Sequence, residues 1–63
     1  MMYKIYGDHN FPTETLLEEF NFVDSARDWF YRYTLRDLGG YKSVTLLSYD
    51  GGVLKCLWEN DDE

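Results

Sequence analysis

The sequence of 63 residues contains one cysteine, one proline and one histidine, and this scarcity excludes several kinds of site. Cys56 has no second cysteine with which to form an internal disulfide. His9 stands in a turn-rich stretch without a neighbouring histidine or cysteine, so we expect an exposed loop residue and no metal site. A charged-then-apolar leader and a run of about 20 apolar residues are both absent. We therefore expect a soluble, cytoplasmic protein that needs no cofactor.

Residue groupings typical of catalysis are absent as well. The chain has no Ser/His/Asp or Cys/His grouping, no glycine-rich phosphate loop and no metal cluster. A reactive thiol needs a cationic neighbour or a helix N-terminus, so we interpret Cys56 as a small core residue beside Trp58. The sequence predicts a protein that is not an enzyme.

Acidic residues number 12 and basic residues 6, which gives a net charge of −6. Negative charge opposes binding to nucleic acid or to anionic lipid and favours a basic partner. The charge also keeps a small aromatic-rich protein soluble, and this second interpretation stays open. Aromatic residues make up 19% of the chain. Each buries roughly 150–250 Å², which supplies a dense core for a single small domain.

Residues 21–40 predict one long amphipathic helix. Asn21 is a suitable N-cap, Asp24 is favoured by the dipole in the first turn, and Gly39 and Gly40 can adopt the positive φ that ends a helix. The helical spacing places six apolar residues on one buried face: Phe22, Val23, Ala26, Trp29, Phe30 and Tyr33.

Two features are predicted for the outer side of this helix. Asp28 and Arg32 form an i,i+4 ion pair. Tyr31 and Leu35 are also i,i+4 neighbours, and we interpret them as an apolar contact patch.

Strands are predicted on both sides of the helix. Met1–Tyr6 alternates with a period of two, and Tyr41–Tyr49 and Val53–Glu59 are joined by a hairpin signal at Asp50–Gly52. The segment Thr13–Phe20 fits either a helix or a strand. We prefer a strand, since a helix would have to stop and restart at residue 21 with no Gly or Pro between.

These elements predict an α+β fold with one helix on one face of a small antiparallel sheet. Their order is β-β-α-β-β, or β-α-β-β if the second segment is not a strand, and the final hairpin is central. The domain is expected to span residues 1–60, with residues 61–63 as a disordered acidic tail. Unless another part of the protein covers it, the face without the helix is expected to leave four apolar residues partly exposed: Leu47, Tyr49, Val53 and Leu57.

An acidic β-hairpin, the helix FNFVDSARDWFYRY, a GGY junction and the ending SYDGG cover most of the chain. This arrangement resembles the very small acidic proteins that bacteriophages use for host takeover or anti-defence, including RNA polymerase inhibitors, anti-CRISPR proteins and nucleic-acid mimics. The group shares no signature, so no motif residue is carried over. The resemblance implies a binding protein that blocks a host enzyme or DNA-binding protein in the bacterial cytoplasm.

We therefore expect an acidic interaction module whose carboxylates occupy a basic protein surface. We expect the protein to be a monomer or a weak dimer. The alternative function is a homo-oligomeric structural or accessory domain that uses the exposed apolar sheet face. Besides Tyr31 and Leu35, the candidate contact residues are acids: Glu14, Glu18, Glu19, Asp50, Glu59, Asp61 and Asp62.

Overall fold

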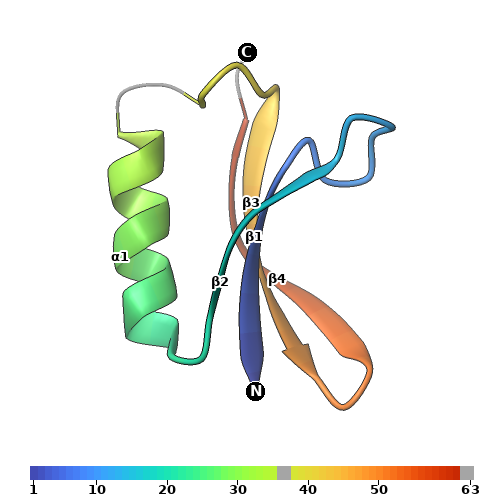
Figure 1. The fold of residues 1–63 in the computed structure, drawn as a ribbon, viewed down its shortest axis with the longest axis vertical. Helices are drawn as coiled ribbons and strands as arrows, with labels where there is room; N and C mark the ends of the chain where they lie inside the picture. The colour runs from blue at the N-terminus through green and yellow to red at the C-terminus, as the bar shows by residue number, and fades with distance from the viewer. Residues whose placement is uncertain (36–37, 62–63) are drawn as a thin grey trace.

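The computed structural model describes residues 1–35 and 38–61, and within them it contains four strands and one helix. Neighbouring strands are antiparallel, and their order across the sheet is β2-β1-β3-β4 (Figure 1). The α+β class and the β-β-α-β-β order are confirmed. The last hairpin is central only in part, because β4 lies at the edge. The elements are β1 (Met2–Gly7), β2 (Thr15–Phe20), α1 (Val23–Thr34), β3 (Ser43–Asp50) and β4 (Val53–Asp61).

The core lies between α1 and one face of the sheet (Figure 1). Ile5, Val44 and Leu46 are fully buried on the sheet side, and Ala26 and Phe30 are buried on the helix side. Half-buried side chains surround this centre: Tyr3, Leu17, Phe20, Trp29, Tyr33, Leu38, Tyr41 and Leu57. The helical periodicity thus identified most of the buried face correctly.

The helix is shorter than predicted at both ends. Its N-cap is Phe22 rather than Asn21, no side chain caps it, and the Phe22 side chain is 72% exposed instead of buried. At the other end the Leu35 N–H donates to the Arg32 carbonyl at 3.4 Å, a tighter turn that ends the helix. Gly39 and Gly40 do have positive φ, but within the connection to β3. Arg36 and Asp37 lie outside the described residues.

A β-bulge in β4 changes which side chains face the helix. Trp58 pairs with Leu46 and Cys56 pairs with Leu47, so Leu57 is the extra residue and packs against the core. Cys56 and Trp58 therefore lie on opposite faces, and the prediction that they share a buried face is wrong, because alternation fails at a bulge. Cys56 is exposed.

The bulge also changes the apolar residues on the face away from the helix. Tyr49 pairs with Leu54 there. Leu54 and Cys56 thus take the places that the sequence assigned to Val53 and Leu57.

The C-terminal strand extends further than predicted. Asn60 pairs with Val44 and Asp61 pairs with Ser43, so Asp61 belongs to β4 and not to an unpaired tail. Pairing with the central strand β3 satisfies backbone groups that a free acidic end would leave to water. Asp62 and Glu63 lie outside the described residues.

Candidate partner-binding surface

Two exposed carboxylates lie on the edge strand β2. Neither Glu18 nor Glu19 forms an ion pair with a described residue. Glu18 accepts a hydrogen bond from the Glu19 N–H at 3.1 Å. Lys4 is directly opposite Glu19 on β1, but its Nζ lies over the ring of Tyr49, 5.5 Å from the ring centroid. Both carboxylates remain available to a partner, as predicted for their exposure.

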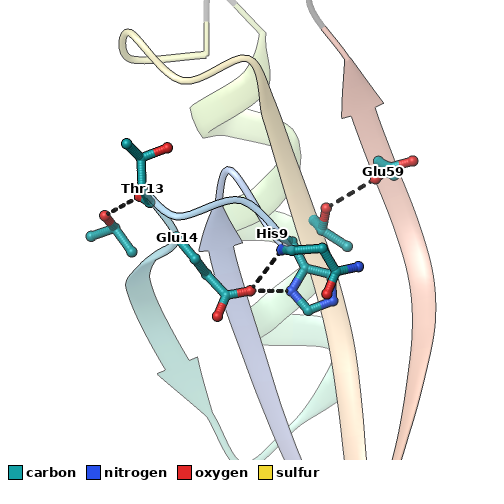
Figure 2. A network of polar contacts seen from close by, with 7 residues as sticks. His9, Thr13, Glu14 and Glu59 are labelled. Atoms are coloured by element: carbon teal, nitrogen blue, oxygen red, sulfur yellow. Dashed lines mark hydrogen bonds and ion pairs between the residues drawn. The ribbon is translucent and has the colours of Figure 1, made fainter.

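Glu14, the third predicted acid of this segment, is engaged in the loop that precedes β2. Its Oε2 accepts from the Asn10 N–H at 2.9 Å and lies 2.6 Å from Nδ1 of His9 (Figure 2). The Asn10 N–H, followed by His9, holds the pKa of Glu14 below its ordinary value. His9 is half-buried rather than exposed, because its ring also packs against the ring of Tyr6, with 5.7 Å between the two ring centroids. The main role of the Glu14 carboxylate is therefore to stabilise this loop.

Asp8 joins this loop to the start of β3. Its carboxylate accepts from the Thr13 hydroxyl at 2.7 Å and from the Lys42 N–H at 2.7 Å, and its own N–H donates to the Ser43 carbonyl. The hydrogen bonds that the carboxylate accepts, that of Thr13 first, lower the pKa of Asp8. The local sequence does not mark Asp8 as a contact residue, although its Gly-Asp-His-Asn context is typical of turns.

The acids of the last hairpin lie in two separate places. Asp50 is at the tip, whereas Glu59 pairs with Thr45 near the other end of β3. Five residues at about 3.4 Å each separate these levels by roughly 17 Å. Glu59 accepts from the Thr45 hydroxyl at 3.3 Å (Figure 2), and Asp61 lies two residues further along the same strand. Glu59 and Asp61 therefore lie close together, and Asp50 does not belong to their group.

The helix acids, in contrast, have basic partners. Asp24 pairs with Arg27 at 3.1 Å, and Asp28 pairs with Arg32 at 3.2 Å, which confirms the predicted i,i+4 pair. Both pairs are exposed, so each contributes a few tenths of a kcal/mol at most to stability, roughly 0.3–0.5 for a helix pair. As a result, the exposed carboxylates that have no ion pair, among residues 1–35 and 38–61, all lie on strands of the sheet.

A shallow groove of about 320 Å³ runs between α1 and β4. It arises because the helix packs mainly against β1, β2 and β3, which leaves Trp58 41% exposed. Tyr31 and Leu35 are 65% and 68% exposed, as predicted for an outward patch, and Tyr31 and Trp58 both line the groove. The lining residues are Arg27, Phe30, Tyr31, Thr34, Trp58 and Asn60.

The face of the sheet away from α1 carries exposed apolar groups. Tyr49 and Leu54 are paired and are 41% and 55% exposed, beside the buried Leu47. Cys56 is next to them, and partial desolvation followed by the Glu59 carboxylate raises the pKa of its thiol. A raised pKa makes Cys56 a poor nucleophile at neutral pH.

No protein-family model, curated protein or solved structure matches this chain. Across residues 1–35 and 38–61, no three His, Cys, Asp or Glu side chains are placed to hold a metal ion. In the same part of the chain, no helix has the length and apolar character needed to cross a membrane. The fold and its surfaces define a small α+β protein with acidic sheet edges and an aromatic groove.

Proposed function

We propose that this protein is a non-enzymatic binding protein, encoded by a bacteriophage, that inhibits a host enzyme or nucleic-acid-binding protein in the bacterial cytoplasm. It acts by occupying a basic surface of that partner. The observation that carries the proposal is the uneven pairing of charges. Helix acids have arginine partners, whereas Glu18, Glu19, Glu59 and Asp61 have no ion-pair partner among the described residues. Unpaired carboxylates steer a basic partner toward the sheet.

The positions of these acids support mimicry of nucleic acid. Glu18 and Glu19 lie on β2, and Glu59 and Asp61 lie on β4, at opposite edges of the sheet. Three strand spacings of about 4.8 Å separate the two edges by roughly 14 Å. Negative charge on two edges at this distance is on the scale of a DNA groove, which is about 12 Å wide. A protein groove that holds nucleic acid therefore suits both charged edges.

The test compares neutralised variants of equal net charge in pull-downs from a bacterial lysate, with partners identified by mass spectrometry. Glu18→Gln with Glu19→Gln, and Asp24→Asn with Asp28→Asn, each remove two negative charges, from −6 to −4. We expect only the first pair to weaken capture. Raising salt from about 50 to 500 mM should also weaken it, because the Debye length falls from roughly 14 to 4 Å. Capture that survives both changes would contradict the proposal.

The exposed pair Tyr49 and Leu54 favours a second candidate, a homo-oligomeric accessory domain that buries the exposed end of the sheet face away from α1. Sedimentation equilibrium at micromolar concentration distinguishes the two. A dimer that Leu54→Lys dissociates would support self-association through this face. A monomer would leave the acidic inhibitor as the better function.

A further inference from the structure

β4 pairs with β3 on one side only and forms an outer edge of the sheet. An edge strand presents unpaired backbone N–H and C=O groups, and an extended peptide can pair with them as an added strand. Beyond the bulge at Leu57, the run from Trp58 to Asp61 pairs with β3 without a register shift. This run is therefore a regular template for one more strand.

The two sides of this run differ in chemistry. Trp58 and Asn60 line the groove beside α1, together with the aromatic Phe30 and Tyr31. Glu59 and Asp61 alternate with them and so lie on the other face of the sheet. A strand added beside β4 also alternates. One set of its side chains would enter the aromatic groove, and the other set would meet the carboxylates.

We propose that the run Trp58–Asp61, with its groove, is the docking site for an extended partner segment in which apolar and basic residues alternate. The apolar side chains pack between Tyr31 and Trp58, and lysine or arginine side chains pair with Glu59 and Asp61. The ion pairs with lysine or arginine rest on the proposed function. The backbone pairing and the apolar contacts in the groove do not depend on it.

The opposite edge of the sheet fits such a segment less well. A register shift at Leu17 interrupts the six-residue strand β2 in its middle. Its unpaired acids, Glu18 and Glu19, are consecutive, so they do not form an alternating row. β2 therefore provides the matched control for charge.

The probe is a blocked heptapeptide of alternating lysine and valine, titrated into ¹⁵N-labelled protein. We expect the largest amide shift changes at residues 57–61, together with the indole N–H of Trp58. N-methylation of one alternate set of peptide amides should weaken binding at least about tenfold, whereas methylation of the other set should not, because only one set faces β4. A peptide of the same composition with its lysines and valines in two blocks should bind at least about tenfold more weakly.

Variants of the protein separate this site from general charge attraction. Glu59→Lys with Asp61→Lys, and Glu18→Lys with Glu19→Lys, both change the net charge by four units, from −6 to −2. Only the first pair should abolish binding, and Tyr31→Ser, at a 65% exposed residue, should weaken it. Circular dichroism checks that each variant is folded. If the first pair unfolds the protein, Glu59→Gln with Asp61→Asn replaces it.

Three results would overturn the inference: shift changes on β2 or at Tyr49 and Leu54, equal effects of both methylation patterns, or no binding at millimolar peptide. The failure of this inference is distinct from failure of the proposed function. Peptide bound at β2 with strong salt dependence would exclude the β4 site and leave the acidic inhibitor in place. Peptide could also bind at β4 with an affinity that changes neither with salt nor in the two charge-reversal variants. That result would exclude ion pairs between the peptide and Glu59 or Asp61, and it would contradict the proposal of an acidic inhibitor.

Discussion

Asp8 follows the last residue of β1 and has a positive φ of 54°, a backbone conformation that Asp and Asn tolerate better than most residues. Its carboxylate contacts the Lys42 N–H, 34 positions later in the chain. One side chain therefore ties the first loop to the start of the last hairpin. Composition marks residues 7–12 as a turn, but this long-range contact depends on the tertiary fold.

The pH dependence of stability should reveal this contact. Hydrogen bonds to ionised Asp8 keep its folded-state pKa below the ordinary value of 3.8. The group therefore stabilises the fold above that value, and the contribution is lost as the pH falls through the lower, folded-state pKa. Asp8→Asn keeps the backbone preference but not the charge. We expect it to lower the melting temperature at pH 7, with a difference from wild type that narrows below 3.8.

Thermal melts followed by circular dichroism between pH 7 and pH 2 measure this difference. Thr13→Ala is the matched variant, because the Thr13 hydroxyl is the first donor to Asp8. Its effect should fade over the same pH range. A melting difference that stays constant down to pH 2 would mean that Asp8 acts through its shape and not through its charge.

At the scale of elements, α1 shows which part of a helix a sequence pattern can predict. The buried stripe at Ala26 and Phe30 follows from spacing alone. The start of the helix does not, because the apolar Phe22 fits the periodic pattern yet has the extended φ and ψ of an N-cap, −124° and 136°. Asn21 has the residue type that caps prefer but lies one position too early, and the apolar spacing does not mark where the helical backbone begins.

Phe22 should therefore be a site where a polar residue stabilises the protein. Phe22→Asp supplies a carboxylate that accepts from the free amides of the first turn and interacts favourably with the dipole. We expect Phe22→Asp to be more stable than Phe22→Ala by roughly 0.5–2 kcal/mol in urea unfolding. If Phe22→Asp proves less stable than wild type, the exposed ring makes stabilising contacts after all.

The strands show a second limit of sequence patterns. A period of two assigns faces correctly along β3, where Val44 and Leu46 are both buried under the helix. It fails in β4, where one extra residue at Leu57 moves Trp58 to the helix side. A bulge has no local signature here, so the aromatic groove could not be predicted. The exposed acids could be predicted, because charged side chains avoid the core.

At the scale of the whole molecule, the grouping of charges follows from strand order. Pairing of β1 with β3 places β2 and β4 at opposite edges, a long-range arrangement that no local pattern specifies. Glu18 and Glu19 mark one edge, and Glu59 and Asp61 mark the other. Charges and bulges on both edges also discourage uncontrolled pairing with further copies of the chain. The same acids thus protect the edges and attract a basic partner.

This arrangement predicts that salt acts in opposite directions on folding and on binding. The net charge of −6 makes the folded chain repel itself, and the sheet acids lack ion-pair partners among the described residues. Salt screens this repulsion, so the melting temperature of the free protein should rise between about 50 and 500 mM NaCl. Over the same range the dissociation constant of the lysine-valine peptide should increase, because its ion pairs with the carboxylates are screened.

Both quantities are measured on one protein sample, by thermal melts and by peptide titration. Glu59→Lys with Asp61→Lys, at a net charge of −2, should show a smaller rise in melting temperature. A melting temperature that falls with salt would indicate that the favourable pairs Asp24–Arg27 and Asp28–Arg32 outweigh the repulsion. If salt stabilises the free protein but weakens peptide binding, salt acts on the complex through the interface. If salt weakened binding by unfolding the protein, the melting temperature would fall as well.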